Sequence, residues 1–345
     1  MTYPLEIKKP FATMLFMSDI RFEATNMKCR IFPANDSGLT EAAEAIRAGG
    51  LVAFPTETVY GLGANALDDR AVAGIYEAKG RPSFNPLIIH IPSMDIACNY
   101  VKFNQTAETL AAQFWPGALT LVLPRLENCP VSKLASAGLD TLAIRIPGHR
   151  LALDFLEKCG CPLAGPSANP SGSISPTTTQ HVFDGLDGKI AGIIDDGPCK
   201  VGVESTVVGF KGDTAVLLRP GGVTEEMLTS TVGAILTHHE DGTTPGPGML
   251  KSHYAPSCPV RLDAHDKQPG EVYLGFGRDQ DALADVNLSE SGNLTEATAK
   301  LFAALHFFDE MNVAGIAVGP IPEAGLGVAI NDRLRRAAAP RNEDE

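Results

Sequence analysis

Four cationic side chains lie inside or at the ends of apolar segments of an otherwise acidic chain. Lys79 and Arg81 follow a predicted helix, Arg145 interrupts an apolar run, and Arg219 ends another. Arginine offers a bidentate fork to phosphate or carboxylate, and lysine offers a mobile point charge. The recurrence predicts a site for an anionic ligand. Taken alone, the Lys79/Arg81 pair fits helix-end electrostatics equally well, because cations are favoured at a helix C-terminus.

Arg145 raises a question of its own, because it stands in the predicted strand 142–146, whose other residues are apolar. An arginine is costly to bury without a partner. Either the strand lies at the edge of a sheet, or the side chain points into a pocket that holds an anion. Both alternatives fit the sequence at this point.

Hydroxyl and amide groups gather in the segment 165–177, directly after a short apolar run. Ser167, Asn169 and Thr177 are the residues of interest there. An ordinary surface turn has the same composition. A rigid loop at a strand end is also how α/β proteins present hydrogen bonds to a ligand.

Alternating strand and helix patterns must position these groups, and 345 residues at about 150 per domain suggest two domains. Predicted strands cover residues 51–54, 87–91, 118–123, 142–146, 190–194, 204–208, 215–218, 271–276 and 313–318. Predicted helices cover residues 40–48, 68–79, 92–99, 106–115, 149–159, 224–236, 294–311 and 326–338. The last two strands and last two helices suggest a small parallel α/β layer.

Four segments follow from this pattern: an N-terminal extension (1–36), a first domain (37–236), a linker (237–259) and a smaller second domain (260–345). The linker is rich in Pro, Gly and Thr, yet it carries Met249, His253 and Tyr254. A segment that only separates domains is usually plainer in composition.

Composition excludes several classes of protein. The net charge of −13 argues against affinity gained by wrapping a nucleic-acid backbone, so no stable DNA binding is expected. The seven cysteines are scattered without a CxxC pair, which argues against structural zinc and fits free thiols in the reducing cytoplasm. No apolar run is long enough to span a bilayer, and the N-terminus lacks signal-peptide order.

A series of ordered motifs resembles the YrdC family over roughly residues 42–338. In the first domain these are PTETVYGLG (55–63), KGRP (79–82), NPLIIH (85–90), WPG (115–117), RIP (145–147), GPSAN (165–169), SPT (175–177), EST (204–206) and RPG (219–221). PGM (247–249), HYAP (253–256), GLG (325–327) and DRL (332–334) match the longer, two-domain form. At Leu250 and Ser252 the linker departs from the family pattern, which often has a basic or aromatic residue at the first position and a basic residue at the second.

The resemblance implies a fold and an activity. The first domain would be a twisted mixed-sheet α/β domain with a concave basic cavity, the second a small Rossmann-like α/β domain, and the linker would cross the cavity mouth. The activity would be that of a nucleotidyltransferase, which forms L-threonylcarbamoyladenylate and pyrophosphate from L-threonine, bicarbonate or CO₂, and ATP. The product would pass to the machinery that transfers threonylcarbamoyl to the adenosine next to the anticodon of tRNA.

The resemblance also implies residue roles. Lys79 and Arg81 would be catalytic, and His253 and Tyr254 would form a linker gate. Mg²⁺ would be held through the ATP phosphates rather than by a protein metal site. ATP would be bound by Arg81, Asn85, Thr141, Asn169, Thr177 and Arg219. Threonine would be bound by Thr58, His90, Arg145, Ser167 and Ser205. For His90, a positioning hydrogen bond is favoured over general-base catalysis, and a core histidine is the third alternative.

Two other functions compete with this one. A double-stranded-RNA or ribosome-binding factor could use the same cavity, although the net charge of −13 disfavours it. A hydrogenase-maturation carbamoyltransferase carries a related domain, but such proteins add CxxC pairs and an acylphosphatase-like region, and neither is visible in this sequence.

Overall fold

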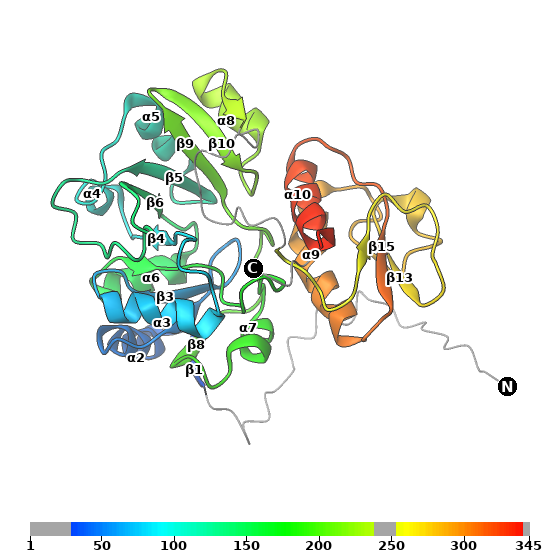
Figure 1. Ribbon diagram of the computed structural model, residues 1–345, viewed down its shortest axis with the longest axis horizontal. Coiled ribbons are helices and arrows are strands. Elements are labelled where there is room, and N and C mark those ends of the chain that lie inside the picture. The colour runs from blue at the N-terminus through cyan, green and yellow to red at the C-terminus, as the bar shows by residue number, and fades with distance from the viewer. Residues whose placement is uncertain (1–28, 238–252, 341–345) are drawn as a thin grey trace.

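The computed structural model describes residues 29–237 and 253–340 and contains two α/β domains, each built on its own sheet (Figure 1). Most of the predicted N-terminal extension and most of the predicted linker, including Met249, Leu250 and Ser252, lie outside the described residues. Within the described ranges, no helix is long and apolar enough to cross a membrane.

The first domain is built on an 11-stranded mixed sheet, so the predicted mixed α/β class is confirmed. Parallel and antiparallel pairs alternate irregularly along the sheet. In spatial order the strands are β1 (Arg30–Pro33), β8 (Gly192–Asp195), β2 (Val52–Phe54), β3 (Gly61–Asn65), β7 (Leu163–Ala164), β4 (Ile88–His90), β6 (Thr141–Arg145), β5 (Leu119–Pro124), β9 (Thr206–Lys211), β10 (Thr214–Arg219) and β11 (Leu236–Thr237).

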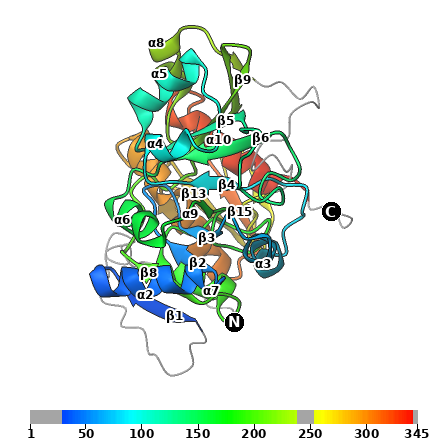
Figure 2. The ribbon, with the colours of Figure 1, turned by 90° about the vertical axis from the view of Figure 1, so that its left-hand side faces the viewer.

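Seven helices accompany this sheet in the described part of the chain: α2 (Asp36–Arg47), α3 (Asp69–Lys79), α4 (Met94–Ala97), α5 (Gln105–Phe114), α6 (Arg150–Cys159), α7 (Thr179–Leu186) and α8 (Glu225–Val232). Figures 1 and 2 show α5 and α8 together at one end of the domain and α2 at the other. The predicted start and stop of α3 are confirmed. Asp68 accepts hydrogen bonds from the first-turn amides, and Gly80 ends the helix at φ 59°, a conformation that glycine adopts without strain.

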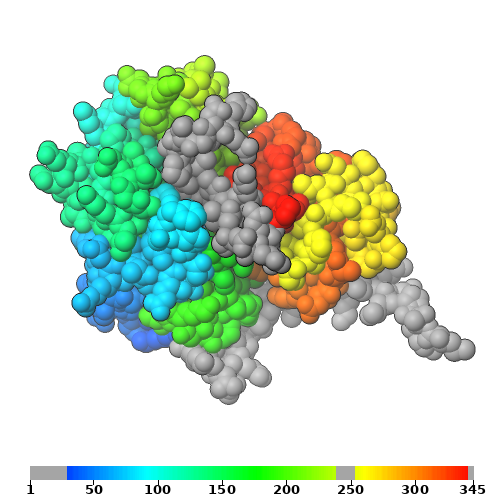
Figure 3. Space-filling view, viewed as in Figure 1, coloured from blue at the N-terminus to red at the C-terminus, as the bar shows by residue number. Residues whose placement is uncertain are grey.

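The second domain contains a small parallel sheet, as predicted. Its strand order is β12 (Val260–Arg261), β15 (Gly315–Val318), β13 (Glu271–Gly275) and β14 (Val286–Asn287). Helices α9 (Leu294–Glu310) and α10 (Leu326–Ala338) lie between this sheet and the first domain (Figures 1 and 3), and a 3₁₀ turn spans Arg278–Gln280. The Rossmann-like assignment of this domain stays a prediction.

The start of the first domain differs from the sequence-based boundary at residue 37. Strand β1 pairs with β8 inside the large sheet, so residues 30–36 belong to the folded unit. The first helix begins before residue 40, where it was predicted to start. Asn35 caps it, because its side chain accepts a hydrogen bond from the Gly38 amide, and Thr40 lies inside α2. The cap was missed because residues 36–39 show little apolar periodicity.

The end of the first domain also differs from the prediction. The helix expected at 224–236 ends at Val232, and Leu236–Thr237 instead forms β11, which pairs with β10. Helix α7 and strand β3 were not predicted. Strand β3 is rich in glycine, and its strand conformation comes from its pairing with β2 and β7 rather than from its own propensity.

The two domains share a hydrophobic core. Val59, Ile174 and Val203 come from loops of the first domain and pack in the same cluster as the apolar face of α9. Next to them, His181 of α7 stacks on His306 of α9, with ring centroids 3.8 Å apart and an interplanar angle of 16°. Burial lowers the pKa of His181 to about 2 and that of His306 to about 4.

We expect the free energy of unfolding to fall as the pH drops from about 7 to about 5. In the unfolded chain a histidine has a pKa of about 6.5 and takes up a proton in this range, whereas the stacked rings stay neutral in the folded chain. Protons therefore favour the unfolded state, by on the order of 1 kcal/mol per ring. Urea unfolding at the two pH values measures this change.

The variants His181→Gln and His306→Gln should each weaken this pH dependence. The matched control is His265→Gln, because His265 is exposed on the second domain and its replacement should leave the pH dependence as in wild type. An unchanged pH dependence in both interface variants would show that the stacked pair does not contribute.

Candidate active site

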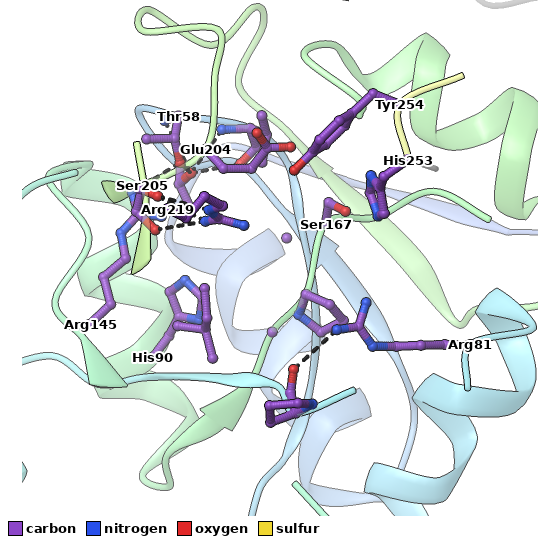
Figure 4. A pocket seen from close by; sticks show the side chains of 17 residues that line it. Thr58, Arg81, His90, Arg145, Ser167, Glu204, Ser205, Arg219, His253 and Tyr254 are labelled. Atoms are coloured by element: carbon purple, nitrogen blue, oxygen red, sulfur yellow. Dashed lines mark hydrogen bonds between the residues drawn. The ribbon is translucent and has the colours of Figure 1, made fainter. Parts of the chain in front are cut away.

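A cavity of about 50 Å³ lies at the strand ends of the first domain, next to the second (Figure 4). Most of the residues predicted from sequence to form a site meet there. The predicted residues that line it are Thr58, Arg81, His90, Arg145, Ser167, Ser205, Arg219, His253 and Tyr254. Lys79, Asn85, Thr141, Asn169 and Thr177 are not among the lining residues.

Two neighbouring strands bring the predicted amino-acid ligands together. His90 ends β4 and Arg145 ends β6, and the two residues are register partners in a parallel pair. Strand β6 lies between β4 and β5, so Arg145 is not on a sheet edge. The sheet-edge alternative is therefore wrong, and Arg145 lines the cavity; that this cavity holds an anion stays a prediction.

Arg145 is 3% exposed and already has a carboxylate partner. Its Nη2 donates to Glu57 Oε1 at 2.6 Å and to Thr58 Oγ1 at 3.0 Å, and its Nε donates to Gly117 O at 3.2 Å. Glu57 Oε2 also accepts the Gly148 amide at 2.9 Å. No role was predicted for Glu57 from the sequence. A buried arginine requires an anionic partner, and this requirement was the signal that could have identified Glu57.

Arg219 approaches the cavity from the end of β10. Its Nη2 donates to Ser205 O at 2.8 Å and to Ser205 Oγ at 3.4 Å. Ser205 Oγ in turn lies 2.7 Å from Thr120 Oγ1 on β5. Burial lowers the pKa of Arg219, which is 4% exposed. This cation is thus fixed by carbonyl and hydroxyl groups that do not neutralise its charge.

Arg81 lies on the opposite side of the cavity from Arg145, just past the end of α3 (Figure 4). Its Nε donates to Asn85 O at 3.2 Å and its Nη2 donates to Pro86 O at 3.0 Å. Burial lowers the pKa of Arg81 to about 10. The guanidinium therefore stays charged at neutral pH and adds a third cation to the cavity wall.

Lys79 supports the site rather than lining it. Its Nζ donates to Ser167 O at 2.5 Å and also to Asn169 O, so it ties α3 to the loop that carries both residues. Burial lowers the pKa of Lys79 well below its usual value, and the Arg81 charge adds to the effect. The catalytic role predicted for Lys79 stays a prediction, and the structure adds a supporting role.

The other residues predicted to bind ATP lie outside the cavity lining. Asn85 and Asn169 are buried, and both amide atoms of Asn85 and the Asn169 Oδ1 have no hydrogen-bond partner among the described residues. Thr177 lies against His181 Nδ1. Thr141 is at the far end of β6, four residues from Arg145, which corresponds to roughly 13 Å along a strand.

The linker residues His253 and Tyr254 close one side of the cavity. Both are nearly fully buried, and their rings meet edge to face with centroids 4.1 Å apart. Tyr254 has a φ of 63°, which is uncommon for a residue with a side chain and costs energy to hold. A strained residue next to a cavity often has a functional role.

Glu204 is a lining residue that sequence analysis quoted in a motif but left without a role. Burial alone would raise its pKa, but Arg333 and Arg219 outweigh that effect, and its pKa falls to about 2. It receives hydrogen bonds from Ser175 Oγ at 2.5 Å and from Arg333 Nε at 2.9 Å. Glu204 is therefore a permanent carboxylate beside two cations, Arg333 and Arg219.

Two family models match consecutive parts of the chain. A model described as "Telomere recombination" matches residues 44–221, and one described as "Threonylcarbamoyl-AMP synthase, C-terminal domain" matches residues 223–339. The threonylcarbamoyl-AMP synthase of Bacillus subtilis is 42% identical over 330 residues, which cover 89% of this chain and 94% of that protein. The chain belongs to the threonylcarbamoyl-AMP synthase family.

Other members of the family agree in sequence and in fold. The Pyrococcus abyssi threonylcarbamoyl-AMP synthase is 43% identical over 320 residues, covering 87% of this chain and 94% of that protein. The crystal structure of P. abyssi Sua5 complexed with L-threonine superposes with a TM-score of 0.82 at 41% identity, covering 90% of this chain and 97% of that one.

Gly165 is expected to be essential to the shape of this cavity. A Cβ added there would lie 2.8 Å from His90 Nδ1, and the ring cannot move freely because it is buried and packs edge-on against Phe54. We expect Gly165→Ala to lower the free energy of unfolding by about 1–3 kcal/mol, the usual cost of overpacking. Urea denaturation measures it.

Gly74→Ala is the matched control. Gly74 lies inside α3, and an added Cβ would meet Leu51 Cδ2 at 3.6 Å, an ordinary contact. This variant should be neutral or stabilising by up to about 1 kcal/mol, because alanine favours helix over glycine. Equal stability of the Gly165→Ala variant and wild type would contradict the inferred tight fit.

Proposed function

We propose that this chain forms L-threonylcarbamoyladenylate and pyrophosphate from L-threonine, bicarbonate or CO₂, and ATP, as a nucleotidyltransferase. The convergence of Arg81, Arg145 and Arg219 on one cavity is the observation that carries the proposal. The reaction brings together an amino-acid carboxylate and a triphosphate, and each of these anions requires a guanidinium or a comparable cation. The family relationship supports the same activity.

The chemistry consists of two bond-forming steps. The threonine amine adds to CO₂ to form a carbamate and loses a proton; starting from bicarbonate, water is also released. A carbamate oxygen then attacks the α-phosphorus of ATP, and the bond to pyrophosphate breaks. Such transfer depends on positioning the reactants and on stabilising negative charge spread over the phosphoryl oxygens.

Arg145 is proposed to bind the threonine carboxylate. Glu57 and Thr58 already orient its guanidinium from one side, and a carboxylate can approach from the cavity side. The P. abyssi protein whose structure contains L-threonine is similar to this chain over nearly its whole length. Thr58, Ser167 and Ser205 would supply hydroxyl or backbone hydrogen bonds to the same ligand.

His90 is proposed to position the substrate rather than to act as a general base. Burial lowers its pKa to about 3, so the imidazole is neutral at pH 7 but is a weak base. General-base catalysis is most efficient when the pKa of the group lies near the working pH. The unpartnered Nδ1 of the buried ring is available for a hydrogen bond to substrate.

ATP is proposed to bind between Arg81 and Arg219, with Asn85, Thr141, Asn169 and Thr177 around it. The buried, unpartnered amide atoms of Asn85 and Asn169 support this assignment, because buried polar groups normally have partners. His253 and Tyr254 are buried side chains in the wall of the cavity that Arg81 and Arg219 also line. We propose that they form a gate.

Mg²⁺ is proposed to enter with ATP. No group of three or more His, Cys, Asp or Glu side chains that could hold a metal ion occurs among residues 29–237 and 253–340. Glu204, the carboxylate of the lining, already accepts hydrogen bonds from Arg333 and Ser175. Magnesium commonly binds through substrate phosphates and waters with few protein ligands, and there it would neutralise phosphate charge. The product would be passed to the tRNA threonylcarbamoyl transfer machinery.

Pyrophosphate release by the full-length chain tests the proposed function. With Mg²⁺ and ATP present, release should require both L-threonine and bicarbonate, and omission of either should reduce it to background. ATP turnover that is indifferent to threonine would refute the proposal. Salt-sensitive RNA binding without threonine-dependent chemistry would favour the RNA-binding alternative instead.

Arg81→Ala should lower kcat by about 10²-fold or more, as expected when a preorganised charge that stabilises a transition state is removed. Arg81→Lys should recover part of the loss, because it restores the charge without the fork. The control is Arg150→Ala, since the Arg150 side chain is 87% exposed and pairs with Asp154 on the surface. Wild-type turnover in Arg81→Ala would exclude Arg81 from the chemistry.

A further inference from the structure

The second domain inserts a buried arginine behind the cavity. Arg333 of α10 is fully covered, and its bonds cross the domain boundary. Its Nε donates to Glu204 Oε2 at 2.9 Å, and its Nη1 donates to Pro220 O at 2.7 Å. A residue of the second domain therefore determines the position of a carboxylate that lines the cavity of the first.

The position of the Glu204 carboxylate matters because of its neighbours. It is the one carboxylate among the described lining residues, and Arg81, Arg145 and Arg219 line the same cavity. Arg333 Nε and Ser175 Oγ hold its two oxygens, so both are engaged away from these cations. Arg219 is close enough for its charge to lower the pKa of Glu204, after the larger effect of Arg333.

Arg333 also contacts Tyr254, a linker residue in the cavity wall. Its guanidinium carbon lies 5.4 Å from the centroid of the Tyr254 ring, within the range of a cation–π contact. The same ring stacks on Phe302 of α9 with centroids 5.5 Å apart. Two second-domain side chains thus keep Tyr254 in its unusual backbone conformation.

The contact between the domains is close enough to fix this geometry. Gly202 lies just before Glu204, and an added Cβ there would be 2.5 Å from Ala299 Cα and 2.5 Å from Thr298 O of α9. Val203 packs into the core of the second domain. The segment that carries Glu204 is therefore seated directly on α9, and Arg333 meets Glu204 from a fixed direction.

We propose that Arg333 is a positioning residue for ATP, which keeps the Glu204 carboxylate turned away from the phosphate-binding cations. Without Arg333, this carboxylate can turn to Arg219, a cation that lines the same cavity. A Glu204–Arg219 pair would compete with the triphosphate. The second domain thereby keeps Arg219 available in the first. The inference rests on the proposed function, because it concerns the nucleotide of that reaction.

Three variants test it in the full-length chain: Arg333→Gln, Glu204→Gln and the double variant. In pyrophosphate release, Arg333→Gln should raise the KM for ATP by about tenfold or more, the effect of losing one charge-assisted hydrogen bond, with a smaller change in the KM for threonine. In the double variant, the KM for ATP should return toward wild type, because a neutral amide does not compete with phosphate.

Arg335→Gln is the matched control on the same helix. Arg335 pairs with Glu323 on the surface, with side chains 54% and 58% exposed, and its loss should leave both KM values unchanged. A merely structural role of Arg333 would instead lower stability and kcat while the KM for ATP stays constant, and adding Glu204→Gln would bring no recovery. That result overturns the proposal.

Two further outcomes separate this inference from the proposed function. If the wild-type chain releases no threonine-dependent pyrophosphate, the proposed function fails. If wild type is active and Arg333→Gln keeps the wild-type KM for ATP, only the role of Arg333 fails. Should Arg333→Gln not fold, Arg333→Lys retains a charge with different reach, and Glu204→Gln must then lower the raised KM for ATP in that background.

Discussion

The first domain depends on burying several basic side chains. Lys79, Arg145 and Arg219 are 3%, 3% and 4% exposed, and a buried charge without partners costs several kcal/mol. The partners come from distant parts of the chain: Lys79 binds carbonyls of residues 167 and 169, and Arg145 binds Glu57. Each cation therefore joins loops that the sheet alone would leave separate, and the cavity exists because these loops meet.

The type of partner decides what the cavity can attract. Backbone carbonyls satisfy hydrogen bonds of Arg81 and Arg219 without cancelling their charge. Only carboxylates cancel charge, and the two in contact with the site, Glu57 and Glu204, are each engaged by an arginine. The local arrangement and not the total charge of −13 sets the field that a small ligand meets, so the basic cavity predicted from the sequence is compatible with an acidic chain.

Sequence patterns predicted the fold class, α3 with its cap and stop, and most residues of the cavity, because these depend on local periodicity and on short motifs. They did not predict the partner of Arg145, since Glu57 lies far from it in sequence and meets it only through the sheet. The supporting contact of Lys79 was missed for the same reason. In the sequence, Arg333 belongs to an arginine-rich helix end of the kind that is usually exposed. Only the packing of α10 on the first domain reveals that it is fully buried.

The proposed gate at Tyr254 implies an energetic requirement for substrate binding. Tyr254 lines the cavity, and its ring contacts Phe302 and Arg333 while its backbone has a conformation that is strained for a tyrosine. Release of Tyr254 relieves that strain but removes contacts with both side chains. A ligand shifts such an equilibrium only by its difference in affinity for the two states. If ATP binds as proposed, its phosphates would supply that difference by pairing with Arg81 and Arg219 once Tyr254 has moved.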